Sequence, residues 1–206
     1  MKTIDCKQGS TAWFVARAGI PTASEFDNVV TPEFKPRTGQ GVESYLLKKV
    51  AERVMGMPAQ AWAGGAAEQG TVLEIEARPW FAFAHGVEVQ DVGFCTTDDG
   101  RLGCSPDGLI GSDGGLELKC PEAYTHLKYL LGGVLPPQYA AQVHGSMLVT
   151  GRAYWQFVSY NRFFPPLVVR VERDEAKIAA LQAALDAFLK QLDAAHAKIK
   201  QLIERK

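Results

Sequence analysis

The sequence lacks the closely spaced cysteine pairs that build zinc sites in proteins. Its four cysteines are Cys6, Cys95, Cys104 and Cys120, and no two of them are three or four positions apart. A chain of 206 residues is long enough to bury a core without disulfides. We therefore expect four reduced and mostly buried thiols rather than a metal centre or a disulfide framework.

Long apolar segments are absent as well. No stretch is apolar over the roughly 20 residues that span a bilayer, and residues 1–5 lack the apolar character of a secretion signal. Internal repeats and low-complexity tracts are also missing. With 47% hydrophobic and 22% charged residues, the composition is that of a globular protein, which we expect to be cytoplasmic.

The sequence also lacks an excess of positive charge. Its 22 Lys and Arg residues face 23 Asp and Glu residues, which gives a formal net charge of −1. A general nucleic-acid binder is usually more basic, so any contact with DNA must come from local basic patches. An acidic metal cluster would offset a basic remainder, so the net charge alone neither supports nor excludes an enzyme that acts on DNA.

The residue pattern predicts one α/β domain over residues 1–206, with a small mixed sheet between helices. Helical patterns cover 11–30, 42–55, 66–85, 122–131, 137–149 and 174–206, and strand patterns cover 87–94, 102–110, 116–120, 153–160 and 167–171. Thr22 and Ser24 are candidate N-caps for the second half of the first helix. Breaks are expected in a mobile proline- and glycine-rich loop at 31–41, at Gly64-Gly65, at 111–115 and at Pro165-Pro166.

The C-terminal segment 174–206 contains no proline or glycine and predicts one long helix. Its apolar residues recur at heptad spacing at Ile178, Leu181, Leu185, Phe188, Leu192, Ala195, Ile199 and Leu202. We expect this stripe to cover the core of its own domain. A coiled-coil contact between subunits is the alternative.

A hairpin over residues 106–120 carries the most informative polar side chains. Strand alternation places Glu117 and Lys119 on one face, with Leu118 on the other. A turn centred on Asp113 would place Asp107 opposite Lys119, so that all three polar groups share the face. Two carboxylates and an amine suit phosphodiester hydrolysis, in which carboxylates hold Mg²⁺ and a lysine orients the attacking water. A simple cross-strand ion pair beside a turn is the alternative.

Similarity to a known family extends over more of the chain than this motif. Five blocks in order, residues 13–25, 70–74, 104–109, 115–121 and 141–147, resemble the viral recombinase nucleases related to phage lambda exonuclease. These YqaJ-like alkaline exonucleases belong to the restriction-endonuclease-like PD-(D/E)xK superfamily. The resemblance implies a restriction-endonuclease-like core with a mixed central β-sheet, flanking helices and a long C-terminal helix.

The resemblance also implies site residues. The implied metal ligands are Asp107, Glu117, the carbonyl of Leu118, and Glu74 on a helix. The implied catalytic residues are Lys119, Glu117, Asp107 and Gln142. Arg17 and Ser24 match a pocket for the DNA 5′-phosphate, to which Ser105 is a candidate addition. Without the resemblance, Glu74, Gln142 and Arg17 would be solvated polar residues, Ser24 a helix cap and Ser105 a turn residue.

One departure limits this match, and one loop extends it. The family has an arginine soon after the Glu-x-Lys block, where this chain offers only His126 or Lys128. The loop with Lys35 and Arg37 is similar to a DNA-binding arm, because basic residues between prolines suit phosphate or groove contacts. A solvated loop is the alternative.

The implied activity is 5′→3′ removal of mononucleotides from one strand of linear double-stranded DNA, with two Mg²⁺ ions, or Mn²⁺ in their place. The implied assembly is a ring-shaped homotrimer in a bacterial host cytoplasm, encoded by a phage or prophage. The 3′ overhang would serve a single-strand annealing protein in homologous recombination. An endonuclease of the same superfamily and an inactive DNA-binding ring are the alternatives; scattered cysteines disfavour an iron–sulfur nuclease.

Overall fold

The computed structural model describes residues 1–57 and 68–205. Its helices are α1 (Thr11–Arg17), η1 (Ala23–Asn28), α2 (Gln40–Met55), α3 (Glu68–His85), α4 (Ala123–Gly132), η3 (Pro137–Tyr139), α5 (Ala140–Thr150) and α6 (Glu175–Glu204). None of the helices in these residues is long and apolar enough to cross a membrane. The expected break at Gly64-Gly65 lies outside the described residues.

Two sheets form the β structure. The larger has the order β2 (Val89–Gln90), β5 (Gly108–Ile110), β6 (Gly114–Lys119), β7 (Tyr154–Asn161) and β8 (Phe164–Glu172). Only β6 and β7 are paired in parallel among these strands, so the sheet is mixed as predicted. The smaller sheet has the order β1 (Lys2–Ile4), β3 (Phe94–Thr96) and β4 (Gly103–Cys104), all antiparallel.

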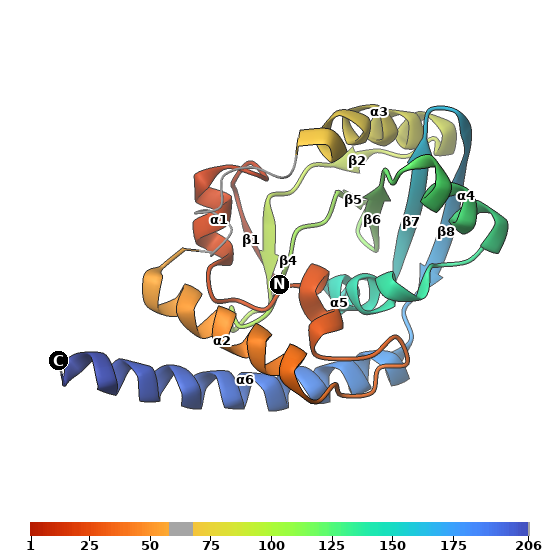
Figure 1. Ribbon diagram of the computed structural model, residues 1–206. Coiled ribbons are helices and arrows are strands. Elements are labelled where there is room, and N and C mark those ends of the chain that lie inside the picture. Colours follow the sequence, from red (N-terminus) through yellow and green to blue (C-terminus); the bar gives the residue numbers. More distant parts are fainter. Residues whose placement is uncertain (58–67, 206) are drawn as a thin grey trace.

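Different helices cover the two faces of the larger sheet, because side chains alternate along each strand. Leu116 and Leu118 of β6 pack with apolar residues of α3 on one face. Phe157 of β7 packs with Met147 of α5 on the other face. Figure 1 shows α3 and α5 on opposite sides of the strands. Glu117 lies between the two leucines, so its side chain points toward the α5 face.

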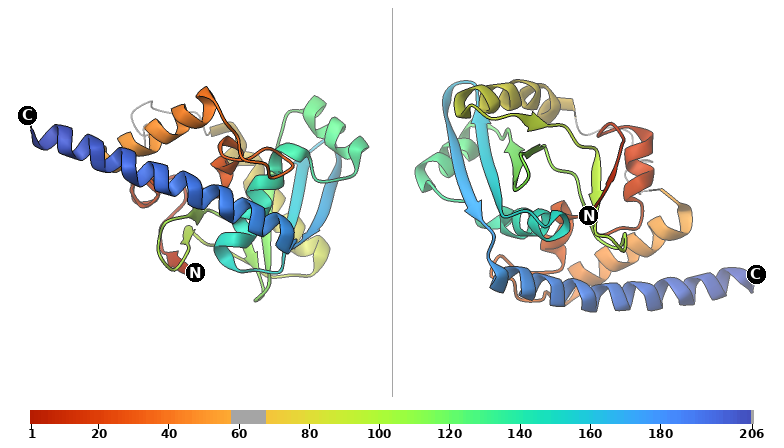
Figure 2. Two further views of the ribbon diagram at one scale, coloured as in Figure 1. Left: turned by 90° about the horizontal axis from the view of Figure 1, so that it is seen from below. Right: turned by 180° about the vertical axis from the view of Figure 1, so that it is seen from behind.

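The long helix α6 runs beneath the domain, along α2 and past the end of α5 (Figures 1 and 2). Leu181, Leu185, Phe188 and Leu192 are buried in a cluster that includes residues of η1 and α2. The apolar stripe therefore covers its own domain over these turns. Near the C-terminal end, Leu202 is exposed.

The first predicted helix, 11–30, is wrong as one element. The chain forms α1 and the separate 3₁₀ helix η1. Gly19 adopts φ +69° between them, which is the left-handed conformation that ends a helix. Thr22 precedes η1 but its side chain makes no capping hydrogen bond there, and Ser24 lies inside the element. Thr22 therefore occupies the predicted N-cap position without a side-chain capping bond, the predicted Ser24 cap is wrong, and both hydroxyls are available for other contacts.

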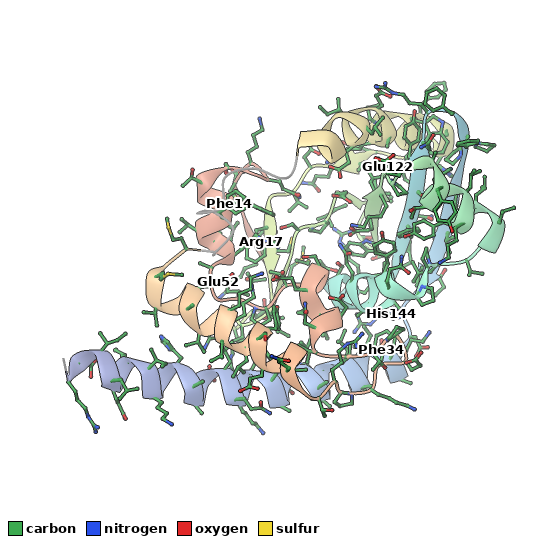
Figure 3. The ribbon with its side chains drawn as sticks, in the orientation of Figure 1. Phe14, Arg17, Phe34, Glu52, Glu122 and His144 are labelled. Carbon is green, nitrogen blue, oxygen red and sulfur yellow. The ribbon has the colours of Figure 1, made fainter. Side chains whose placement is uncertain are left out.

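The predicted mobile loop at 31–41 is a closed turn in the structure. The Thr31 N–H donates to the Lys35 carbonyl at 2.8 Å, and the Arg37 N–H donates to the Val29 carbonyl at 2.7 Å. Phe34 is buried and lies edge-on to His144 at 5.2 Å between ring centroids (Figure 3). This buried ring fixes the loop, which the prolines and glycines alone do not indicate.

Three predicted strand boundaries are also wrong. The expected strand at 87–94 is divided between β2 and β3, which belong to different sheets, and the expected strand at 102–110 is divided between β4 and β5. Pro165-Pro166, expected to join two strands, lies inside β8. An edge strand accepts proline because one row of its backbone N–H groups needs no ladder partner.

Gly114 and Gly115 belong to β6 rather than to the turn. A methyl group at Gly114 would overlap the Tyr154 ring, and one at Gly115 would overlap the Trp155 ring. The glycines thus admit the aromatic side chains of β7, the parallel neighbour. Glycine in a strand often marks such a close approach, and this packing shortens the turn to residues 111–113.

We predict that Gly115→Ala lowers the free energy of unfolding by about 1–3 kcal/mol, because the methyl group overpacks the core. Gly41→Ala is the matched control, since a methyl group there meets nothing within 4 Å in the first turn of α2. The control should raise the free energy of unfolding by about 0.5–1 kcal/mol. Urea denaturation measures both values, and equal changes would contradict the packing role of Gly115.

Candidate active site

The pairing of β5 with β6 determines which polar groups meet. Gly108 lies opposite Leu116, and Leu109 lies opposite Gly115. One step further, Asp107 is opposite Glu117, and its N–H donates to the Leu116 carbonyl at 3.1 Å. The predicted pairing of Asp107 with Lys119 is therefore wrong by two residues. An even shift leaves every side chain on its predicted face.

The site is centred on the buried carboxylate of Glu117, which is 3% exposed. Its Oε1 atom accepts hydrogen bonds from Lys119 Nζ at 2.5 Å and from Gln142 Nε2 at 2.5 Å. Asp107 Oδ2 accepts a hydrogen bond from the Leu118 N–H at 2.6 Å. The structure thus brings together five residues that the sequence assigned to one site, namely Asp107, Glu117, Leu118, Lys119 and Gln142.

Glu74 reaches the same region from α3. Glu74 and Asp107 line one groove of about 770 Å³, together with Arg78, Gln90 and the segment around Cys6. Burial raises the pKa of Glu74, and the charge of Glu117 raises it further, while Lys119 and Arg78 oppose these effects. The groove therefore contains the carboxylates of two elements that are distant in the sequence.

The charges in the site are not balanced. Burial raises the pKa of Asp107 well above its usual value, and the neighbouring Glu117 adds to this effect. Burial alone would lower the pKa of Lys119, but Glu117 and Asp107 raise it above its usual value. Lys119 is therefore an ammonium group at neutral pH. Even with this charge present, the pKa values of Asp107 and Glu74 stay above their usual values, so a further cation beside them would stabilise both carboxylates.

The donor set fits a magnesium ion. Among residues 1–57 and 68–205, no three His, Cys, Asp or Glu side chains form a ready-made cage for a metal. Mg²⁺ does not need one, since it binds one or two carboxylates and keeps several waters. The N–H and C=O of one strand residue point to the same side, so the Leu118 carbonyl faces Asp107 beyond the end of β5.

Tyr139 joins this site, although the sequence did not single it out. The Lys119 Nζ atom is 5.3 Å from the centroid of the Tyr139 ring, which packs against Phe157 at 5.1 Å. The lysine thus lies between the Glu117 carboxylate and an aromatic face that attracts cations. The sequence feature that could have pointed to Tyr139 is its spacing, because Tyr139 precedes Gln142 by three residues, about one helical turn.

A second polar cluster surrounds Arg17 at the end of α1. Arg17 Nη1 donates to Ser105 Oγ at 2.9 Å, and Nη2 lies 3.2 Å from Thr22 Oγ1 and 3.5 Å from Ser24 Oγ. The Trp13 indole donates to Ser105 Oγ at 2.8 Å, and its ring lies 4.2 Å from the guanidinium carbon. The three predicted pocket residues meet here. The sequence alone did not indicate that Trp13 and Thr22 belong to this cluster.

This cluster, defined by Arg17, Thr22, Ser24 and Ser105, is a candidate phosphate site that we call the anion pocket, and the chain connects it to the carboxylate site. Ser105 precedes Asp107 by two residues on the segment between β4 and β5. The Gln8 side chain donates to the Pro106 carbonyl at 2.8 Å and to the Val92 carbonyl at 2.9 Å, which holds this segment in place. Ser105 of the anion pocket and Asp107 of the carboxylate site are therefore held on one short chain segment.

Other predicted residues lie elsewhere. Lys35 and Arg37 belong to the turn beside α6, and Arg37 Nε donates to the carbonyls of Asp27 at 2.5 Å and Val30 at 3.0 Å. His126 is fully buried, with ring nitrogens 2.8 Å from Ser159 Oγ and 3.0 Å from the Pro165 carbonyl. His126 therefore cannot replace the family arginine. Lys128 is exposed on α4.

The mixed sheet, its two helical layers and the hairpin with Asp107, Glu117 and Lys119 define the restriction-endonuclease-like α/β class, as the resemblance implied. The chain belongs to the YqaJ-like viral recombinase family, whose model matches residues 12–153. A search of curated proteins gives no match.

Solved structures agree with this assignment. An alkaline exonuclease from Laribacter hongkongensis is 31% identical, with a TM-score of 0.85 over 95% of this chain and 99% of that one. Its complex with dAMP gives 32% identity, the same TM-score and the same coverage. A phage-related exonuclease from Haemophilus somnus 129PT shares the fold at a TM-score of 0.64 and 13% identity, over 87% of this chain and 96% of that one.

We predict that Asp107→Asn stabilises the metal-free protein at pH 7. A raised folded-state pKa means that ionised Asp107 costs stability once the pH exceeds the unfolded-state pKa of about 3.9. The variant should therefore melt a few degrees higher than the wild type in EDTA, since ~1 kcal/mol shifts Tm by about 2–4 °C in a chain of this size. The difference should vanish below about pH 4, where the group is protonated in both states.

Differential scanning fluorimetry measures both Tm values, and a second measurement in Mg²⁺ tests the metal role of Asp107. Adding Mg²⁺ should raise the Tm of the wild type more than that of Asp107→Asn, because a ligand stabilises the state that binds it. A metal-free variant less stable than the wild type at pH 7, or an equal response to Mg²⁺, would contradict the assignment of Asp107.

Proposed function

We propose that this chain is a Mg²⁺-dependent exodeoxyribonuclease that removes mononucleotides in the 5′→3′ direction from one strand of linear duplex DNA. One observation carries the proposal. On the hairpin that also holds Asp107, Glu117 accepts hydrogen bonds from Lys119 and from Gln142 of α5, in a chain 31% identical to an alkaline exonuclease. The anion pocket at Arg17 supports an activity that starts at a strand end.

Asp107, Glu117, Glu74 and the Leu118 carbonyl would hold two Mg²⁺ ions, or Mn²⁺ in their place. When bound, these ions polarise the phosphodiester and lower the pKa of the attacking water. The protein supplies the remaining groups. The Lys119 ammonium orients that water and offsets charge that develops on the phosphate. Gln142 holds Glu117 through its hydrogen bond, and Tyr139 limits the movement of Lys119.

The anion pocket would select the bond that is cut. The Arg17 guanidinium and the Ser24 and Ser105 hydroxyls suit a 5′-phosphate, because a guanidinium donates two parallel hydrogen bonds to phosphate oxygens. The Trp13 ring packs against the face of the Arg17 guanidinium and supports it. A terminal phosphate bound here would fix the distance from the strand end to the carboxylates. Cleavage would then release one nucleotide at a time.

The proposal extends to assembly and partners by family membership. A homotrimeric ring around DNA would retain the product strand between successive cleavages. The remaining 3′ overhang would pass to a single-strand annealing protein during phage-type homologous recombination. Lys35 and Arg37 would contact the DNA backbone outside the active site.

A digestion time course tests the activity. We predict that wild-type protein with Mg²⁺ releases 5′-labelled mononucleotide early from linear duplex DNA, while 3′ label stays in long strands and a closed circle stays intact. Cutting of the circle would indicate an endonuclease. Binding without any cutting would indicate an inactive DNA-binding protein.

In the same assay, Lys119→Ala should lower the cleavage rate by about 10²–10⁴-fold while duplex binding in EDTA is retained. Lys190→Ala is the matched control, because Lys190 is exposed on α6 and far in sequence from every site residue. Near-normal turnover of Lys119→Ala would remove this residue from the mechanism.

Arg17→Ala should weaken the preference for 5′-phosphorylated over 5′-hydroxyl ends by about tenfold to a hundredfold, the value of hydrogen bonds to a charged group. Initial rates on the two kinds of duplex end measure the preference. Arg170→Ala, which removes an exposed arginine paired with Glu172 on β8, is the control. An unchanged preference in Arg17→Ala would contradict the anion pocket.

A further inference from the structure

Four charged side chains are packed together between η1 and α2, beside the anion pocket. Lys49 Nζ lies 2.8 Å from Glu25 Oε2 and 2.9 Å from Glu52 Oε2, and Lys48 Nζ lies 2.7 Å from Glu25 Oε1. Lys49 and Glu52 are only 3% and 1% exposed. Buried ion pairs contribute little net stability compared with apolar packing. The position of this cluster suggests a different role.

One end of the cluster holds the turn that follows Arg17. Glu52 Oε2 accepts the Gly19 N–H at 3.1 Å, and Arg53 Nε donates to the Gly19 carbonyl at 3.0 Å. Figure 3 shows Arg17 on α1 and Glu52 on the facing helix α2. Both polar backbone groups of Gly19 are thus bound by α2. The position of Arg17, two residues earlier, depends on this contact.

The other end of the cluster reaches the pocket itself. Thr22 Oγ1 lies 3.4 Å from Glu25 Oε2, 3.2 Å from Arg17 Nη2 and 3.3 Å from Ser24 Oγ. A carboxylate only accepts hydrogen bonds, so Thr22 must donate its single hydrogen to Glu25. The Thr22 oxygen then accepts from Arg17. Glu25 therefore fixes the direction of hydrogen bonds along this chain of groups.

The charges fit the same role. Burial alone would raise the pKa of Glu25, but Lys49 and Lys48 lower it to about 2, so the carboxylate stays ionised at neutral pH. Two carboxylates offset two lysines, which leaves the cluster without net charge. The Arg17 guanidinium is then the positive charge of the pocket that would face an anion bound there.

We propose that Glu25 is a positioning residue of the anion pocket, which acts through Thr22 and the α2 lysines to align Arg17 and Ser24 for a DNA end that carries a 5′-phosphate. This inference rests on the proposed function of the pocket. Glu25 does not touch the phosphate. Its effect is to distinguish phosphate-terminated from hydroxyl-terminated strands.

The test is Glu25→Gln, which keeps the shape of the side chain and removes its charge. In EDTA, fluorescence anisotropy with 5′-phosphorylated and 5′-hydroxyl duplexes should show that the preference for phosphate falls by about fivefold to tenfold. Binding of the hydroxyl-terminated duplex should stay unchanged. With Mg²⁺, the KM for phosphorylated ends should rise while kcat on hydroxyl ends is retained.

Three further variants separate positioning from general stability. Thr22→Val should lower the phosphate preference as Glu25→Gln does, whereas Thr22→Ser should keep it. The double variant Glu25→Gln with Thr22→Val should lower the preference little further, because both substitutions act on one contact. Val50→Ala, buried in α2 outside the ion cluster, should lower stability but keep the end preference. The Thr22 variants also test the proposal if Glu25→Gln fails to fold.

The outcomes are distinct. A wild-type preference that persists in Glu25→Gln and Thr22→Val would overturn the positioning role and leave the pocket in place. An equal loss of end preference in Val50→Ala would show that lower stability causes the effect, and would also overturn the positioning role of Glu25. A wild-type protein without any end preference would overturn both the pocket and the inference.

Discussion

The pairing of β5 with β6 is the constraint on which the rest of the site depends. It places Asp107 opposite Glu117 and leaves the Leu118 backbone on the side of Asp107. The register is held by packing on the far side of β6, where Gly114 and Gly115 admit the rings of Tyr154 and Trp155. A side chain at either glycine would force that ring, or the strand that carries Glu117 and Lys119, to shift.

This register has an electrostatic consequence. Glu74 and Asp107 line one groove, and the charge of the neighbouring Lys119 does not cancel the effects of burial and of Glu117, so the pKa values of both carboxyl groups are raised. Such a site stores the cost of bringing like charges together, as functional sites commonly do. The rigid sandwich of α3, the sheet and α5 supplies the packing that makes the arrangement stable.

The anion pocket depends on a different part of the fold. Arg17 belongs to a short helix whose own packing is limited, since α1 has no buried residues. Its position comes from contacts made by others, namely the Trp13 and Ser105 hydrogen bond, the clamp of α2 on Gly19 and the link from Glu25 to Thr22. Helix α2 in turn packs on α6 through Tyr45 and Phe188, whose rings stack at 5.3 Å. The long C-terminal helix therefore supports the pocket indirectly.

The sequence by itself determined the helices with regular apolar spacing, the mixed α/β class and the face shared by Asp107, Glu117 and Lys119. These follow from local periodicity, which an even register error does not disturb. It pointed to Arg17, Ser24, Ser105, Glu74 and Gln142 as candidate site residues only through resemblance to a family, since each is an ordinary polar residue in its local context.

Only the tertiary structure decided the turn between β5 and β6, the break after α1, the burial of Phe34 and the contacts of Thr22, Tyr139 and the Glu25 cluster. Each depends on packing between segments far apart in the sequence. A glycine that makes room for a tryptophan in the next strand has the same local signature as a glycine in a turn, so neighbours in space must decide between them.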